Sequence, residues 1–380
     1  METPTGQEQF SVPQDVEYWL ALSRLPRVGR ATFLRLVETF QTPRAAWERS
    51  DTEWNNAEVS RVRLTTHDFR KPAFEWAQEQ VVRLRNSVWR IILFGSPGFP
   101  ASLSSLRYPP PYLFVRGEIP EGPAIAVVGS RQATDYGVRV THEIAEDLAA
   151  AGVTIVSGFA RGIDTVAHKA AVHVGGKTVA VWGTGPDIVF PHENESLVDV
   201  VAAHGALITE FPFGTAADAA NFPVRNRLIA GLSDGVLVAQ ARRRSGALLT
   251  AQHALEQGKD VFAIPGEIGQ ESFVGTHELL KEGARMVTGA DDILDALHLP
   301  ARSKRATRSE RAEAARPLPL PPLTEIERRI YEALGTTACH IDRLAVSLRL
   351  SVGETARVLT LLELKGLVTK QAGNQIARAR

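Results

Sequence analysis

Hydrophobic and polar residues follow three patterns along the chain, and each pattern predicts a different kind of structure. Residues 15–85 place apolar side chains three and four positions apart, the spacing of amphipathic helices. One such series runs from Trp19 to Leu25 and another from Phe33 to Phe40. The segment between them contains proline and glycine and predicts a tight turn. We therefore expect residues 1–85 to form an N-terminal all-α domain.

From about residue 124, short β-branched and apolar runs alternate with helical stretches. Near-continuous apolar strands separated by helices are typical of a parallel sheet covered on both faces. Several runs end in glycine, and ligands of such sheets bind at the carboxyl ends of the strands. We expect an α/β domain over residues 86–300 with an extended Rossmann-like parallel sheet. The seven predicted strands are 124–129, 153–158, 177–183, 206–211, 234–241, 260–266 and 284–289.

The remaining residues predict a linker and a small third domain. Residues 301–322 are basic at first and proline-rich at the end, a composition that buries no core. Helical patterns follow at 325–334, 341–348 and 352–365, with a short β-like segment after them. Three helices and a β-tail within residues 323–380 predict a winged-helix domain.

Composition is that of a globular protein of two to three domains. Of the 380 residues, 44% are hydrophobic and 23% are charged, which is ordinary for a chain with packed cores. Cys339 is the single cysteine, so an intrachain disulfide is excluded and a small, half-buried apolar role is expected. The first residues do not resemble a signal peptide, and no run approaches the roughly 18 apolar residues of a membrane span. We expect a cytoplasmic protein that does not contact a membrane.

The formal net charge is zero, which by itself argues against a nucleic-acid partner, but the arginines are clustered. The first predicted strand ends in Gly129, Ser130 and Arg131. Glycine lets the backbone approach a ligand, while the hydroxyl and the guanidinium can donate to a phosphate. The spacing is not G-x-G-x-x-G, and no acid follows the second strand, so NAD is disfavoured. Anion binding explains Arg131 better than capping of a neighbouring helix.

Two further loops bring arginines to the same predicted edge. Gly158 leads into Arg161, and Arg242-Arg243-Arg244 precedes Ser245 and Gly246 after the fifth strand. Within the first of these segments, Asp164 is expected to cap a helix and His168 to lie in the packed interior. Solvent exposure alone explains one arginine-rich loop. Three such loops at one edge of the sheet instead favour a binding site for a polyanionic ligand.

The segment 221–227 combines Phe222 with Arg225, Asn226 and Arg227 and precedes a predicted helix at 228–232. Arginine neutralises phosphates, and a phenylalanine face stacks on an unpaired base, a contact worth roughly 1–3 kcal/mol. A helix N-terminus with exposed arginines and a buried phenylalanine explains the segment alone equally well.

The motifs of common catalysts are missing from the sequence. There is no G-x-S-x-G elbow, no Walker loop and no H-E-x-x-H helix. His192 and Glu193 have no further ligand at metal spacing, so a surface loop is expected there. Carboxylates are scarce in the loops after the predicted strands, which removes the usual acid–base pair. The sequence predicts a binding protein that is not an enzyme and uses no metal or cofactor.

Taken together, these residues resemble the DNA-processing protein A (DprA/Smf) family over about residues 88–290. The N-terminal helices resemble its helix-hairpin-helix or sterile-alpha-motif-like domain, and the C-terminal helices resemble its winged-helix domain. The shared motifs lie at 129–131, 157–168, 183–194, 222–233, 245–251 and 262–266.

The resemblance implies binding of single-stranded DNA at the basic sheet edge and homodimerisation through the Rossmann-like domain. It also implies loading of the RecA recombinase onto incoming strands in natural transformation. Lys177, before the third strand, is a weaker candidate for a phosphate contact. The predicted DNA-binding residues are Gly129, Ser130, Arg131, Gly158, Arg161, Lys177, Phe222, Arg225, Asn226, Arg227, Arg243, Ser245 and Gly246.

Two positions depart from the family pattern. Arg27 replaces the first glycine of the usual Pro-Gly-x-Gly hairpin turn. We expect weaker amide-to-phosphate contacts at this turn, partly compensated by the basic side chain. Gln240 stands where the family commonly has glutamate after the fifth strand, which makes the edge more basic.

Two other functions remain open from the sequence. Residues 265–266 and 275–276 are distantly similar to the phosphate loop of lysine-decarboxylase-like phosphoribohydrolases. However, Leu279 occupies the position of the catalytic glutamate, and Glu278 is one residue off, about 100° away on a helix. The other alternative is a transcriptional regulator that reads duplex DNA with its winged helix.

Overall fold

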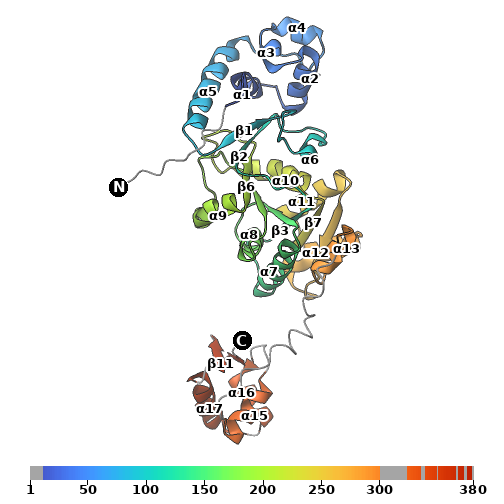
Figure 1. The fold of residues 1–380 in the computed structure, drawn as a ribbon. Helices are drawn as coiled ribbons and strands as arrows, with labels where there is room; N and C mark the ends of the chain where they lie inside the picture. The colour runs from blue at the N-terminus through green and yellow to red at the C-terminus, as the bar shows by residue number, and fades with distance from the viewer. Residues whose placement is uncertain are drawn as a thin grey trace, which may run out of the picture. The chain divides into compact units, whose positions relative to one another are not determined.

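The computed structural model describes residues 12–299, 323–334, 339–348, 350–364, 367–371 and 375–378 (Figure 1). The chain divides into two compact units, Met1–Arg302 and Ser303–Arg380. Across the described residues, no helix combines the length and the apolarity that a membrane span requires. The predicted linker at 301–322 lies outside the described residues.

A nine-stranded sheet forms the centre of the first unit, in the order β1-β2-β6-β5-β4-β3-β7-β8-β9. All seven predicted strands are present and pair in parallel. The last is much shorter than predicted and lies at the edge of the sheet, paired only with β8. The strands are β3 Ala124–Gly129, β4 Thr154–Ser157, β5 Thr178–Val181, β6 Gly205–Thr209, β7 Gly235–Gln240, β8 Asp260–Ala263 and β9 Arg285–Met286.

Two strands that the sequence analysis missed make the sheet mixed rather than wholly parallel. β1 Arg90–Leu93 pairs antiparallel with β2 Tyr112–Gly117, which pairs antiparallel with β6. Each is a short apolar run, and a run of this length has no period that separates strand from buried helix. They extend the sheet towards the N-terminal helices.

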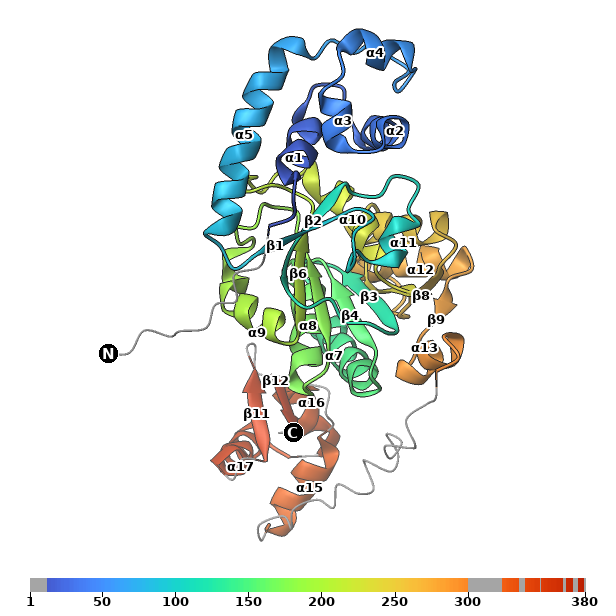
Figure 2. The same cartoon turned by 45° about the horizontal axis from the view of Figure 1, so that its top comes forward.

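Alternate residues of each strand point to opposite faces, so the sheet has a core on each side. On β3, Ile125 and Val127 face one core, while Ala126 and Val128 face the other. The first core is covered by α7 Asp135–Ala150, α8 Ile163–His173 and α13 Ala290–Ala296. The second is covered by α6 Ala101–Ser104, α10 Asn221–Gly231, α11 Gly246–Glu256 and α12 Val274–Lys281 (Figure 2). The shorter α9 Val198–Ala203 follows a 3-10 turn, η1 His192–Leu197, and a second turn, η2 Glu271–Phe273, precedes α12.

The N-terminal region is helical, as predicted. Its helices are α1 Val16–Arg24, α2 Arg30–Phe40, α3 Pro43–Trp47, α4 Asp51–Asn56 and α5 His67–Arg85. Phe33 and Trp54 centre a small core among α1 to α4. Leu20 of α1 and Leu84 of α5 instead share a core with Phe114 of β2. Because of this shared core, the helices belong to the same compact unit as the sheet, and a separate domain at 1–85 stays a prediction.

The second unit has the winged-helix arrangement predicted for it. Its helices are α15 Glu325–Ala333, α16 Ile341–Leu348 and α17 Val352–Leu364. A three-stranded sheet adds β10 Cys339–His340, β11 Val368–Gln371 and β12 Gln375–Arg378, in the order β10-β12-β11. Cys339 is half-buried, as expected.

Candidate functional site

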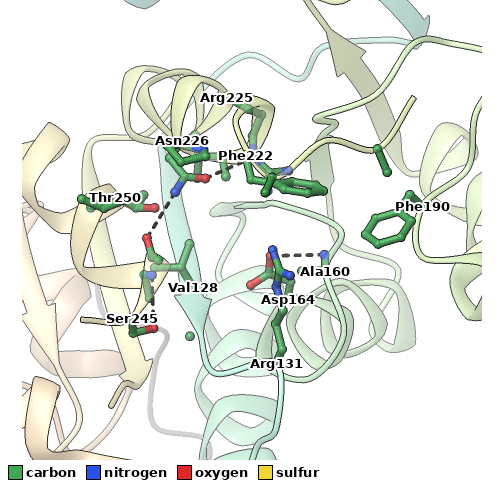
Figure 3. A pocket seen from close by; sticks show the side chains of 18 residues that line it. Val128, Arg131, Ala160, Asp164, Phe190, Phe222, Arg225, Asn226, Ser245 and Thr250 are labelled. Carbon is green, nitrogen blue, oxygen red and sulfur yellow. Dashed lines mark hydrogen bonds between the residues drawn. The ribbon is translucent and has the colours of Figure 1, made fainter. Parts of the chain in front are cut away.

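A pocket opens where the chain reverses its direction across the sheet. The connection after β3 leads to β4 on one side, and the connection after the adjacent β7 leads to β8 on the other. Ligands of open α/β sheets bind at such switch points, outside the carboxyl ends of the strands. The structure has a cavity of 460 Å³ there, lined by residues from β3, α8, α10 and α11 (Figure 3). The site lies at the sheet edge that the sequence predicted.

The pocket brings together residues from three of the predicted segments. Gly129 ends β3 and Arg131 lies in the loop after it, while the others come from the first half of α10 and the start of α11. The predicted residues that line the cavity are Gly129, Arg131, Phe222, Arg225, Asn226, Ser245 and Gly246.

An aromatic pair with a cation beside it forms one wall. The Phe190 and Phe222 ring centroids are 5.7 Å apart at 36°, and the Phe190 side chain is 40% exposed. The guanidinium carbon of the exposed Arg131 lies 5.1 Å from the Phe222 centroid. Phe222 packs against Gly183, where a Cβ would come within 2.8 Å of the ring. This wall offers an aromatic surface and a free positive charge to one ligand.

Arg225 lies beneath this wall and is only 4% exposed. Its guanidinium donates to the carbonyl oxygens of Gly158, at 2.6 Å, and Val181. Burial lowers its pKa to about 10, against the opposing effect of Asp164, so it remains charged at neutral pH. Arg225 therefore does not fit the alternative interpretation of this segment, a helix N-terminus with exposed arginines. α10 begins at Asn221 rather than at the predicted 228, because proline is tolerated in the first turn of a helix, and this turns Arg225 inward.

Asp164 balances the buried charge of Arg225. Its Oδ2 accepts from the amides of Gly158, at 3.1 Å, and Ala160, at 3.3 Å. Burial raises its pKa to about 6, although Arg225 and these amides act in the opposite direction. Asp164 does not take the predicted N-cap position of α8, which is Gly162. Gly158 is required between the two charges, since a Cβ there would lie 2.7 Å from Asp164 Oδ2 and 2.8 Å from Arg225 Nη2.

The N-terminus of α11 supplies a second positive feature. Ser245 is its N-cap, accepting from the Ala247 amide at 3.3 Å, and no atom lies within 4 Å of a Cβ built on Gly246. Asn226 Nδ2 donates to the Gly246 carbonyl at 3.2 Å, which fixes α10 against α11. The open end of a helix dipole attracts anions.

Ser130 shapes the loop after β3. Its amide donates to the Gln240 carbonyl at 2.8 Å and its hydroxyl to the Gln132 carbonyl at 2.9 Å. Gln240, the residue that departs from the family pattern, is fully buried, and its Oε1 accepts from the Thr134 amide at 3.0 Å. Its side chain therefore holds the start of α7 and does not face a ligand.

Three of the predicted arginines are paired with carboxylates outside the pocket lining. Arg161 pairs with Glu193 of η1, and Arg243 Nε donates to Glu278 of α12 at 2.8 Å. Arg227 pairs with a buried acid, Glu210, at the end of β6. The expectation that carboxylates are scarce at this edge is wrong, because η1, α12 and the end of β6 bring them from other parts of the chain.

One predicted DNA-binding residue lies away from the pocket. Lys177 directly precedes β5, so it lies at the amino edge of the parallel sheet, opposite the pocket.

His168 is fully buried, as expected, and hydrogen-bonds Thr178 Oγ1 at 2.7 Å. Burial and the charge of Arg225 lower its pKa to about 3. His192 and Glu193 are exposed in η1.

The residues that would form a phosphoribohydrolase loop are used for packing. A Cβ on Gly266 would lie 2.0 Å from Phe273, so that ring fills the space next to the glycine. Leu279 is buried in the core, and Glu278 carries the pair with Arg243. This part of the chain offers no open cradle beside Gly266.

Sequence reasoning missed Phe190 as a pocket residue and assigned Asp164 a local role. Phe190 lies in an irregular loop after β5, where no periodicity marks it. The sequence did contain a signal that Asp164 belongs to the pocket. It lies in the first turn of a helix that follows a parallel strand, so it lies at the same sheet edge as the arginines.

A mostly parallel, doubly wound sheet with a pocket at its switch point places the chain in the Rossmann-like α/β class, here joined to a winged-helix domain. The model of the family "DNA recombination-mediator protein A" matches residues 90–298, and that of the "DprA winged helix domain" matches residues 314–374. The chain belongs to the DNA recombination-mediator protein A (DprA/Smf) family.

Similar proteins cover most of the chain. Protein Smf of Synechocystis sp. is 31% identical over 396 residues, which cover 95% of this chain and 98% of that protein. The X-ray structure of DNA processing protein A from Streptococcus pneumoniae superimposes with a TM-score of 0.61 at 33% identity, covering 73% of this chain and 95% of that one. A Helicobacter pylori DNA processing protein A, solved to study its single-stranded DNA binding mode, has a TM-score of 0.50 at 28% identity, covering 55% and 95%.

Proposed function

We propose that this protein binds single-stranded DNA in the pocket at the carboxyl edge of the sheet and acts as a recombination mediator. The observation that carries the proposal is the position of the Arg131 guanidinium over the Phe222 ring, with the α11 N-terminus in the same cavity. A guanidinium and a helix end suit a phosphate, and an aromatic ring suits an unpaired base. The Helicobacter pylori relative, described by its single-stranded DNA binding, supports the same ligand.

A comparison of oligo-dT with a duplex of equal length tests the proposal, using fluorescence anisotropy at several salt concentrations. We expect the single strand to compete better, with an affinity that falls steeply as salt rises. Arg131→Glu should abolish this binding. Arg139→Glu, on the neighbouring α7, is the matched charge reversal and should leave it nearly unchanged. Binding of duplex in preference to oligo-dT would favour a winged-helix regulator instead.

The finer part of the proposal is that the protein loads RecA onto the bound strand in natural transformation. The family description as a recombination mediator supports it. The test measures the lag before RecA hydrolyses ATP on a strand coated with single-strand-binding protein. The wild-type chain should shorten the lag, and Arg131→Glu should not. An unchanged lag with wild-type protein would refute RecA loading while leaving DNA binding intact.

We further propose that the protein is a cytoplasmic homodimer formed through the Rossmann-like domain. Exposed apolar side chains flank the β8–β9 edge of the sheet, including Ile268 at 93% and Met286 at 59% exposure. An unpaired edge strand is a ready surface for a second chain. Light scattering should give the mass of two chains, and Met286→Glu should shift it towards one.

We propose that the protein is not an enzyme. The packing of Phe273 on Gly266 supports this over the phosphoribohydrolase alternative. Incubation with nucleoside monophosphates tests it directly, and release of free base would overturn it.

A further inference from the structure

A buried carboxylate joins the N-terminal helices to the helix that carries the pocket residues. The Glu210 side chain is 5% exposed and directly follows β6, at the carboxyl edge of the sheet. Its Oε2 accepts from Nε of Arg30 at 3.0 Å and from Nη2 of Arg227 at 2.5 Å. Arg30 is the first residue of α2, and Arg227 lies next to the pocket residue Asn226 on α10. The bridge therefore fixes the start of α2, and the turn before it, against the helix that carries several pocket residues.

Exposed arginines without a carboxylate partner among the described residues lie in this turn and in the loop between α4 and α5, which it contacts. Arg27, Arg61 and Arg63, here called the hairpin arginines, are exposed, and Arg27 Nη1 donates to the Arg63 carbonyl at 3.4 Å. Within the described part of the chain, none of the three forms an ion pair, whereas Arg161 and Arg243 near the pocket do. The hairpin arginines therefore carry free positive charge next to the start of α2.

The backbone conformation of Arg27 is a second indication that this residue has a function. Its φ of 66° lies in the left-handed region, where glycine is favoured and larger residues are uncommon. A residue kept in a strained conformation is a reason to look for a function. Glycine would relieve the strain but would remove the charge.

We propose that the hairpin arginines form a second phosphate-binding surface for the strand held in the pocket. The inference rests on the proposed binding of single-stranded DNA. A cavity of 460 Å³ accommodates only part of a strand, so phosphates outside it meet the adjoining surface. The contact is made by guanidinium groups, which donate to phosphate in a fork geometry. The Arg30–Glu210–Arg227 bridge sets the position of this surface relative to the pocket.

Oligonucleotides of two lengths separate the two surfaces in the full-length protein. A dT oligomer of only a few nucleotides occupies mainly the pocket, whereas one of about 30 also reaches the surface around it. The double variant Arg27→Glu/Arg63→Glu should bind the short oligomer as wild type does and the long one at least about tenfold more weakly. The slope of log K against log salt for the long oligomer should become shallower by about 1.4, at 0.7 for each lost contact.

The matched control is Lys71→Glu/Arg85→Glu, which reverses two exposed charges on α5. It should bind both oligomers as wild type does, and unchanged melting temperatures should confirm that all variants fold. Unchanged binding of the long oligomer by the Arg27/Arg63 variant would overturn the inference and leave the pocket intact. Failure of wild-type protein to bind either oligomer would instead refute the proposed function.

The variant Arg27→Gly distinguishes phosphate binding by the Arg27 side chain from phosphate binding by the backbone amides of the turn. If the guanidinium holds the phosphate, this variant should lose affinity for the long oligomer only. If the turn's amides hold it, affinity should be kept or increased, and the side-chain contact would be rejected.

Discussion

The guanidinium carbon of Arg131 lies 5.1 Å from the centroid of the Phe222 ring, with the Phe190 ring beside it at a centroid distance of 5.7 Å. The two members of the pair come from different elements, since Arg131 follows β3 and Phe222 is the second residue of α10. Their contact places a positive charge and an aromatic surface at one position.

Phe222→Ala should weaken binding of oligo-dT by about 5- to 150-fold, because stacking contributes roughly 1–3 kcal/mol per base. Phe222→Tyr keeps the ring and should bind within a few-fold of wild type. Phe69→Ala, which removes an exposed phenylalanine from α5, is the control. Equal affinities of the alanine and tyrosine variants would show that the ring does not stack on DNA.

Arg225→Ala should destabilise the fold by about 2–5 kcal/mol, because the buried carbonyl oxygens of Gly158 and Val181 lose their donor and Asp164 loses a nearby opposite charge. Arg131→Ala should change the free energy of unfolding by less than about 0.5 kcal/mol, because Arg131 is exposed. Urea denaturation measures both. A loss of stability in Arg131→Ala as large as in Arg225→Ala would contradict the assigned burial.

His168 should make stability depend on pH. Its pKa is lowered to about 3 by burial, so between pH 6.5 and 3 the unfolded chain takes up a proton that the folded chain does not. The free energy of unfolding should therefore fall as pH falls through this window, by up to about 1.4 kcal/mol per pH unit. His168→Asn, which can still donate to Thr178, should lack this contribution. The stability difference between wild type and variant should be constant with pH if His168 does not titrate this way.

Asp164 should make DNA binding depend on pH, because its pKa is raised to about 6 by burial. It is ionised at pH 7.5 and largely protonated at pH 5, and protonation removes a negative charge from the pocket. The affinity for 5′-hydroxyl oligo-dT should rise several-fold over this range. In Asp164→Asn the affinity should not change over this pH range. If the rise seen with wild-type protein persists in this variant, the rise must come from the protonation of another group.

Glu278→Gln should strengthen DNA binding a few-fold, because it releases Arg243 for phosphate. The salt dependence should steepen by the amount expected for one added contact, about 0.7 in the slope. Glu256→Gln, an exposed acid on α11, serves as the control. Weaker binding by Glu278→Gln would show that the Arg243–Glu278 pair positions the loop for DNA.

Local patterns were enough to predict the strands from β3 to β9 and the edge that carries the site. A buried parallel strand is an apolar run, and the residue after it must lie at the carboxyl edge, so both facts can be read from neighbouring residues. The same logic places Lys177 at the amino edge, which the sequence analysis overlooked. β1 and β2 were missed because short apolar runs have no period that distinguishes a strand from a buried helix.

Charge balance was decided only by the tertiary structure. Arg131 and Arg225 are the same residue type in motifs at one edge, yet one is exposed and the other is buried against Gly158. The carboxylates that pair with the remaining arginines lie on η1, on α12 and after β6, and no local pattern connects them to their partners. Which arginines are free depends on distances across the fold, because Coulomb energy follows separation in space and burial rather than position in the chain. The sequence alone thus determined at which edge of the sheet the candidate site lies, and the tertiary structure decided which of its arginines remain free of a carboxylate partner.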